Sequence, residues 1–533
     1  MIVLSQIISA LVICKYKKMA FRFSLIFFLT LLNYYSYSQH WLGISSSNFA
    51  GTNGIYLNPS SIVDSRFKVY LNVGGNDFFL MNDYLRYNAP YSTFSILTNT
   101  VSSKYRNERG LIIWKEDFYK ENLNGKPKNI NVGGDIRGPS ILYSSKNRKF
   151  AYGISTRGRY QLDLTNVTEQ TARIIRFGTD PVEFQNELYL DQKANLSTNG
   201  FLEIAGTFGA VLRDDEEDFW KAGINVKRLI GMFNTHANLQ SADYSVLPLI
   251  IPPEREIIFA PYLKSVYGFT SEEATKFRLT PSWLFGNAPA GSGWGIDLGI
   301  SYEYRPEIRK YKLASAKAGE RYNDPKKNKY KFRISAALND IGSIRYKNPA
   351  LVSQYDIERS NVTFSYVQFD GKGNPTGATG AVNKTLNLRA NENFSPYTVI
   401  LPTTVNISLD YLYKDNFYVN AIWIQGLTKS GYLNISPQSV LAVIPRYERK
   451  WLEVSMPISV IDNYSTVAVG LGLRAGPVIL GTDHLGGLFN IGHARGLDLY
   501  FGLYAPLFHK KPASPNPCYV QPDLNKKKKF FFF

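Results

Sequence analysis

Long stretches in which every second residue is apolar constrain the fold of this chain more than any other feature of its sequence. In residues 452–460 (LEVSMPISV) the apolar side chains alternate with Glu453, Ser455, Pro457 and Ser459. The same alternation recurs in four other segments: 67–73, 294–304, 404–413 and 497–505. Successive side chains of a β-strand point to opposite faces, so this period of two indicates strands with one apolar face. Strands of soluble sheets usually have about five or six residues, whereas a tilted strand needs about 9–11 to cross a bilayer. Because the predicted strands are long, the pattern favours an all-β, transmembrane antiparallel β-barrel.

We predict fourteen strands: 66–75, 130–143, 149–164, 199–213, 219–230, 293–305, 330–342, 402–413, 416–427, 438–446, 450–460, 465–474, 477–482 and 496–508. Short polar turns, such as Lys146–Lys149 and Arg446–Arg449, alternate with long connections at 76–129, 165–198, 231–292 and 343–401. Outer-membrane barrels show this asymmetry, with short periplasmic turns, longer outer loops and an even number of strands. The link 306–329 is long for a periplasmic turn, and twelve or sixteen strands stay open because boundaries drawn from one sequence are imprecise.

Aromatic residues near the strand ends are predicted to form the interfacial girdles of such a barrel. The candidates are Tyr302, Tyr304, Tyr411, Tyr413, Tyr500 and Tyr504. A soluble double-sheet protein, with a second sheet covering the apolar face, is the alternative architecture.

Composition excludes several other classes of protein. Apolar residues make up 44% of the chain, which argues against intrinsic disorder. After residue 40 no uncharged apolar run is long enough for a membrane-spanning helix. The two cysteines, Cys14 and Cys518, lie near the ends, so we expect no disulfide, Cys-ligated zinc or thiol nucleophile in the body. Nucleic acid is not an expected partner of an exported barrel, despite the formal net charge of +18.

The start of the chain predicts export and gives the domain plan. Arg22, an apolar run of roughly ten residues, and small residues at Ser36 and Ser38 are typical of a signal peptide. We therefore assign residues 1–38 to a signal peptide whose true start is Met19, and expect the mature protein in the outer membrane. Residues 39–65 precede the first strand, residues 66–508 form the barrel, and the Pro- and Lys-rich tail 509–533 is predicted to be disordered.

No catalytic or metal site can be assigned from the sequence, and no cofactor is expected. The chain has five histidines and none of them forms a paired motif such as His-Glu-x-x-His. His484 and His493 flank one predicted outer loop, where ordinary polar loop residues are the simpler interpretation. The acidic run Asp214–Asp218 lacks the spacing of a calcium loop and is interpreted as a solvated turn.

Residues 54–71 (GIYLNPSSIVDSRFKVYL) resemble the start of a Bacteroidota outer-membrane barrel family of unknown function. Within them, Asn58-Pro59-Ser60 is similar to an Asn-Pro-Ala-like element of the FadL fatty-acid channels and of PorV-type barrels, with Ser60 in place of the usual Ala. In FadL-like barrels the segment before the first strand folds into the lumen as a hatch. The resemblance therefore implies an N-terminal luminal plug over residues 39–65, with Asn58, Pro59 and Ser60 as its motif.

Three functions stay open on this evidence. The first is a plugged conduit or binder for apolar small molecules. The second is a non-transporting scaffold that works with other envelope proteins through its long outer loops. The third is an outer-membrane barrel enzyme, for which no catalytic set can be identified. Outer-membrane lipid and lipopolysaccharide are the expected surroundings, since a basic outer surface suits anionic headgroups.

Overall fold

The structure is a computed structural model of the chain. The residues that it describes are 41–179, 181–248, 256–278, 280–286, 288–314, 321–325, 327–365, 382–388, 394–429, 431–437, 439–461, 464, 466–492 and 495–510. The expected signal peptide and almost all of the predicted tail lie outside the described residues. No helix within the described part of the chain is long and apolar enough to cross a membrane.

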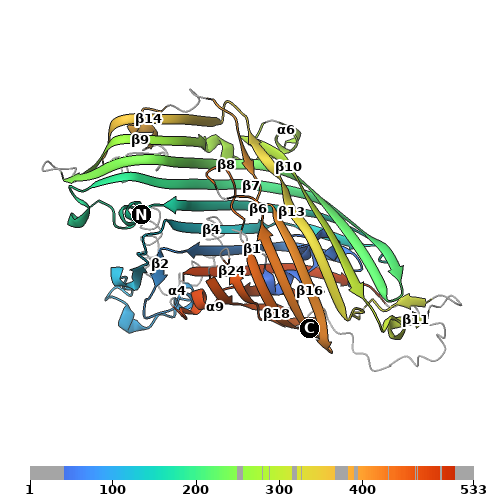
Figure 1. Ribbon diagram of the computed structural model, residues 1–533. Helices are drawn as coiled ribbons and strands as arrows, with labels where there is room; N and C mark the ends of the chain where they lie inside the picture. Colours follow the sequence, from blue (N-terminus) through green and yellow to red (C-terminus); the bar gives the residue numbers. More distant parts are fainter. Residues whose placement is uncertain are drawn as a thin grey trace.

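Fourteen antiparallel strands, four of them broken into two pieces, close into a barrel (Figure 1). They are β1 (Phe67–Asn82), β4–β5 (Lys128–Arg137 and Ser140–Ser144), β6 (Phe150–Val167), β7 (Leu188–Asp215), β8 (Asp218–Pro248), β10 (Gly291–Tyr304), β13 (Phe332–Tyr346), β15–β16 (Tyr397–Ile400 and Thr404–Lys414), β17 (Phe417–Gly426), β18 (Val440–Glu448), β19–β20 (Leu452–Ser455 and Ile458–Ile461), β21–β22 (Thr466–Val469 and Leu471–Ala475), β23 (Val478–Thr482) and β24 (Gly496–Phe508). The first and last strands pair from Phe67↔Phe508 to Met81↔Gly496. The predicted barrel with fourteen strands is confirmed.

The alternation in residues 452–456 gives the correct face of this strand. Leu452, Val454 and Met456 are exposed on the outside of the wall, whereas Glu453 and Ser455 are buried on the inside. The girdle prediction fails at Tyr500 and Tyr504, which share the inward phase of Asp498 and are only 3% and 2% exposed. Both rings pack on aromatic side chains inside the barrel, so they belong to its interior.

The two ends of the barrel differ in their connections. At the turn end, where β1 begins and β24 ends, most links are short. The exception is the predicted long link, which holds η7 (Ile308–Tyr311) and the hairpin β11 (Lys312–Ala314) and β12 (Arg321–Asn323). The predicted turn Arg446–Arg449 begins too early, because Arg446 lies within β18 and is buried at 2% exposure.

The opposite loop end carries the long connections and most of the helical turns (Figure 1). Its elements are β2 (Leu85–Tyr87), α4 (Thr93–Leu97), η3 (Ser103–Tyr105), η4 (Glu116–Phe118), β3 (Tyr119–Glu121), α5 (Glu169–Phe177), η5 (Val182–Phe184), η6 (Glu272–Thr275), α6 (Pro281–Leu284) and α9 (Leu485–Phe489).

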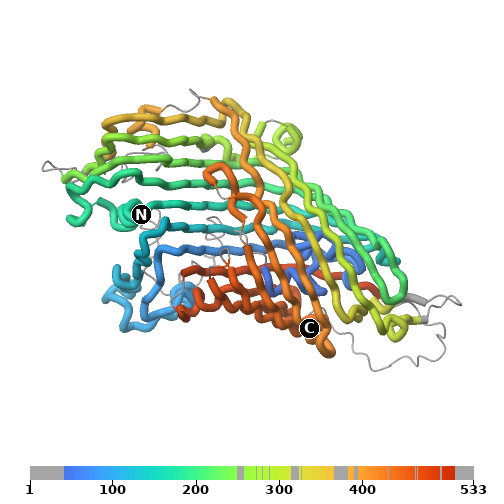
Figure 2. The backbone as a smooth tube through the Cα atoms, viewed as in Figure 1, coloured from blue at the N-terminus to red at the C-terminus, as the bar shows by residue number. Residues whose placement is uncertain are grey.

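The barrel sheet extends beyond the loop end on one side. β7 and β8 continue past the barrel, and the outer part of β8 pairs with β9 (Glu256–Thr270), which in turn pairs with β14 (Val352–Ser365) (Figures 1 and 2). Tyr244, Tyr267 and Tyr355 are among the side chains buried within this extension. The connections predicted as loops over 231–292 and 343–401 therefore contain strands that lengthen the wall.

Candidate functional site

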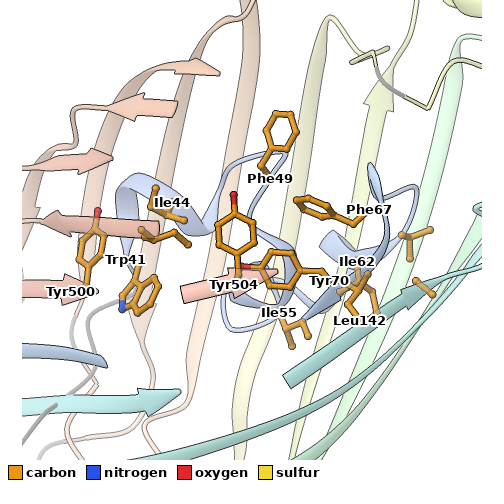
Figure 3. Close-up of a cluster of buried hydrophobic side chains, with 13 residues drawn as sticks. Trp41, Ile44, Phe49, Ile55, Ile62, Phe67, Tyr70, Leu142, Tyr500 and Tyr504 are labelled. Atoms are coloured by element: carbon orange, nitrogen blue, oxygen red, sulfur yellow. The ribbon is translucent and has the colours of Figure 1, made fainter. Parts of the chain in front are cut away.

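Residues 41–65, called here the N-terminal segment, lie inside the barrel before β1. They form three short helical turns, α3 (Leu42–Ser45), η1 (Gly51–Gly54) and η2 (Pro59–Ile62). Trp41 stacks on Tyr500, and Tyr70 stacks on Tyr504, in one buried cluster that also contains Ile55 (Figure 3). The segment thus has an apolar core of its own, shared with the first and last strands.

The motif predicted from the resemblance makes direct contact with the wall. Asn58 begins η2, because its Oδ1 accepts a hydrogen bond from the backbone N–H of Ser60 at 2.8 Å. Its Nδ2 donates to the backbone oxygens of Ile300 (3.2 Å) and Ala336 (3.1 Å), on two neighbouring strands. Ser60 Oγ lies 2.6 Å from Ser301 Oγ. Pro59 occupies the first position of the turn, where a missing N–H costs no hydrogen bond.

Two wall glycines make this approach possible. A Cβ at Gly299 would lie 2.1 Å from Asn58 Oδ1, and a Cβ at Gly223 would lie 2.5 Å from the carbonyl carbon of Pro59. Real Cβ atoms do not come this close to other heavy atoms, so any other residue would displace the motif. The sequence contains these glycines within ordinary strand patterns, and only the structure shows what they accommodate.

Neutral donors of the segment bind carboxylates on the opposite wall. The backbone N–H of Leu42 donates to Asp483 Oδ2 at 3.0 Å, and Ser47 Oγ donates to Glu453 Oε2 at 2.9 Å. Trp41 Nε1 donates to Asp77 Oδ2 at 2.9 Å. A Cβ at Gly43 would lie 2.5 Å from Ser455 Oγ, so the backbone of α3 lies against this wall without a side chain between them.

A charged anchor holds the segment at the turn end. Asp64 pairs with Arg305 (2.8 Å), Lys329 (3.1 Å) and Arg148 (3.3 Å). Burial alone would raise the pKa of Asp64, but Lys329, Arg148 and Arg305 outweigh it and hold the pKa well below its ordinary value. Sequence reasoning missed this anchor. Arg305 and Lys329 flank the long link at the turn end, within the basic stretches 305–312 and 326–329. These stretches and the unusual length of the link were the available signals.

Inward-facing charges fill much of the middle of the lumen. Asp135, Glu203 and Asp340 all pair with Arg157 or Arg159, and Lys227 joins Asp297 at 2.7 Å. Buried ions remain charged only when they are paired and hydrogen-bonded in this way. This arrangement cross-links strands that are distant in sequence, and it makes the interior around the segment polar.

An apolar cavity of about 660 Å³ opens at the loop end, beside β21. Its apolar lining residues include Val467, Val469, Leu485 and Ile491, with Arg495 among its polar neighbours. Val467 and Ile491 are 75% and 66% exposed, so the cavity is open on the outer side of the wall. β21 pairs with β20 along one edge, and α9 lies along its other side. The cavity is therefore located where a helix takes the place of a neighbouring strand. Pockets that bind small molecules commonly have volumes of roughly 300–1,000 Å³, so this volume suits one such ligand.

The histidines contribute structure in the part of the chain that can be described. His484 precedes α9, and its Nδ1 accepts a hydrogen bond from the N–H of Gly487 at 2.7 Å. His493, the other histidine that flanks this loop, lies outside the described residues. Among the described residues, no group of three or more His, Cys, Asp or Glu side chains is placed to hold a metal ion.

Comparison with known proteins places this barrel in a family. Residues 59–483 match the family of unknown function DUF5723. The chain belongs to this family. The match begins at Pro59, inside the Asn58-Pro59-Ser60 motif, and ends at Asp483, which anchors Leu42. No curated protein matches the sequence.

Several solved structures have a similar fold at very low sequence identity. The Ralstonia pickettii toluene transporter TbuX is 7% identical, with a TM-score of 0.36, and the match covers 86% of this chain and 94% of that one. The Pseudomonas putida toluene transporter TodX is 8% identical, with a TM-score of 0.34 and coverages of 87% and 94%. A Pseudomonas aeruginosa FadL homologue is 11% identical, with a TM-score of 0.28 and coverages of 89% and 98%.

Proposed function

We propose that this protein is an outer-membrane barrel that binds apolar small molecules and passes them inward, with the N-terminal segment as its plug. The observation that carries the proposal is the apolar cavity beside β21, at the end of the barrel with long loops. Exposed apolar residues on alternate wall positions suit insertion in a bilayer, and the short turns suit a periplasmic end. The proposed activity is passage and binding, with no chemical step.

The way in which the N-terminal segment is held supports its proposed role as a plug. Its contacts run from Asp483 on one wall to Ser301 on another and to Arg305, the partner of Asp64, at the turn end. Most of these contacts are hydrogen bonds and ion pairs to side chains, whereas the barrel strands pair with one another through their backbones. The segment can therefore leave its place while the wall stays intact.

Conductance of the purified protein in planar bilayers tests the plug. A chain that lacks residues 39–65 should still form a barrel and should show a large rise in single-channel conductance. The matched control lacks residues 511–533, which lie beyond the last barrel strand. Equal, near-zero conductance in all three proteins would contradict a plugged conduit.

Binding of an apolar fluorophore such as 1-aminoanthracene, measured in amphipol, tests the cavity. Val467→Gln and Leu485→Gln replace apolar lining side chains by amides and should weaken binding, because a bound apolar ligand would cover the amide without giving it a hydrogen-bond partner, at a cost of about 1–3 kcal/mol. Val443→Gln, at an exposed position on β18 away from the cavity, is the control. Unchanged affinity in both lining variants would contradict this binding site.

The extension of β7, β8, β9 and β14 supports a second candidate, a scaffold for other envelope proteins. It continues the barrel sheet beyond the loop end and has its own buried aromatic cluster. If the protein is such a scaffold, its long connections bind the partner proteins, and removal of the plug would leave partner binding intact. Pull-down from outer-membrane extracts, with the protein lacking residues 39–65 compared against the full chain, separates the two candidates.

A further inference from the structure

The charged anchor at the turn end contains more cations than carboxylates. Two carboxylates, Asp64 and Glu303, are paired there. The cations that pair with them among the described residues are Arg148, Lys221, Arg305 and Lys329. Lys221, Arg305 and Lys329 are at most 7% exposed. An excess of two positive charges in a buried cluster is unfavourable unless another anion or solvent offsets it.

A cavity of about 70 Å³ adjoins this cluster, between the N-terminal segment and the wall. Arg305, Lys221 and Lys329 line it, together with Ser61 of the segment. The exposed Lys327 also lines it, on the link at the turn end. One water needs roughly 10–15 Å³ on this measure, so the space suits a few waters or one small anion.

Two buried polar atoms of residues that line the cavity make no hydrogen bond. Nη1 of Arg305 is buried and makes no hydrogen bond, although Nε and Nη2 of the same guanidinium bind Glu303 and Asp64. Ser61 Oγ is also buried and unbonded. Buried donors are nearly always satisfied, by water or a ligand where the protein does not supply an acceptor. A guanidinium fork and a hydroxyl are donors typical of oxyanion sites.

We propose that this cavity binds one small oxyanion, a carboxylate or a phosphate, through Arg305, Lys329, Lys221 and Ser61. The anion lies under the N-terminal segment and offsets the excess charge around Asp64. Burial, helped by repulsion from Arg148 and Arg305, lowers the pKa of Lys329 to about 7, as expected where cations exceed carboxylates. This inference goes beyond the proposed conduit and is independent of whether apolar solutes pass.

Equilibrium dialysis of the purified full chain tests the proposal, with radiolabelled phosphate as the probe and acetate as a competitor. The buffer is held at pH 6.5 and at constant ionic strength with chloride. Lys329→Met should weaken phosphate binding about tenfold, the loss expected for one charge-assisted hydrogen bond. Ser61→Ala, which touches no ion pair, should weaken it a few-fold. Lys310→Gln is the control, because Lys310 is exposed and pairs with Glu307 outside the cavity.

Saturable binding of about one anion per chain, weakened by both cavity variants and unchanged in the control, supports the site. Competition by acetate then identifies a carboxylate-accepting site, and failure to compete identifies a phosphate site. Absence of saturable binding would overturn the proposal. So would equal affinity in Ser61→Ala and the wild type, or equal losses in Lys329→Met and the control.

Discussion

The wall of this barrel is built differently on its two sides. On the long side, β6, β7, β8 and β10 have 14 to 31 residues each, and β7 and β8 pair almost without a gap. On the short side, β19 to β23 have four or five residues each. On the long side the same sheet continues beyond the barrel through β9 and β14, whereas the short side leaves room for α9 and the apolar cavity.

Local sequence explains much of the difference. Pro457 separates β19 from β20 and has no N–H to donate to a neighbouring strand. Gly470 separates β21 from β22, and a Cβ there would lie 2.6 Å from the carbonyl oxygen of Thr482. The long side has no proline within the parts of β7, β8 and β10 that form the barrel. The short side is therefore interrupted at Pro457 and Gly470, whereas these barrel parts of the long side are not.

The largest expected effect comes from the anchors of the N-terminal segment, which differ between the two sides. Asp64 binds cations that adjoin the long side, and Asp483 of the short side binds the N–H of Leu42. Asp64→Asn leaves Arg305, Lys329 and Arg148 without their carboxylate, and should cost about 3–5 kcal/mol. Asp483→Asn retains an oxygen acceptor and should cost far less. Urea unfolding and protease cleavage of the segment measure the loss of stability in each variant. Equal losses in Asp64→Asn and Asp483→Asn would show that the two anchors contribute equally.

The next effect concerns charges on the outside of the wall. Val454→Arg on the short side and Phe208→Arg on the long side each place a cation at an exposed apolar position. At mid-bilayer this costs about 2–4 kcal/mol on either side. We expect a larger loss of folded protein for Val454→Arg, because β19 has only four residues of pairing to oppose it. Heat-modifiable migration on gels, after refolding into lipid vesicles, gives the folded fraction. Equal fractions would mean that strand length does not set local stability.

A smaller effect is expected where the motif meets the long side. Asn58→Ala removes the cap of η2 and two hydrogen bonds to backbone oxygens, and should cost about 1–3 kcal/mol. Gly299→Ala changes the wall instead of the segment and should also release the segment, because the added Cβ would collide with Asn58. Hydrogen exchange of residues 41–65 is the measurement. Protection that survives in both variants would contradict the role of the motif.

The smallest expected effect is a pH dependence of the long-side anchor. Lys329 has a pKa of about 7 in the folded protein, against about 10.4 when unfolded. Above pH 7 the unfolded chain therefore binds more protons at this residue, so stability rises with pH, by about 1 kcal/mol between pH 7 and 8. Asp64 adds no slope in this range, because its pKa is depressed and its contribution is lost only in acid. The rise should vanish in Lys329→Met, and an identical pH profile in that variant would refute the assignment.

The barrel was predictable because each strand carries its own pattern, and residues 452–460 show its phase without any knowledge of neighbours. The extension of the sheet through β9 and β14 was not predictable, because β9 contains Pro261 and follows a proline-rich stretch that argues for a loop. Tyr500 and Tyr504 show the limit of residue type as a guide. Their position in the alternation placed them in the barrel interior, whereas their aromatic character wrongly suggested the membrane–water interface.

The candidate site was predictable only in its motif. Asn58, Pro59 and Ser60 contact the wall, as a hatch motif would, but their partners include glycines and backbone oxygens that carry no recognisable signal. The anchor of Asp64 depends on residues brought together by closure of the whole barrel. Such contacts between distant parts of a chain cannot be read from local patterns.

Closure of the barrel also has a consequence for the order of folding events. Asp64 lies 241 residues before Arg305 and 265 before Lys329, and β1, which follows it directly, pairs with the last strand. Asp64 and β1 therefore cannot make these contacts until nearly all the remainder of the chain has been synthesised and folded. Contacts over such distances form slowly, because the intervening chain has to be ordered first. Seating of the N-terminal segment and joining of the first and last strands are thus expected as a single late event in the assembly of this protein.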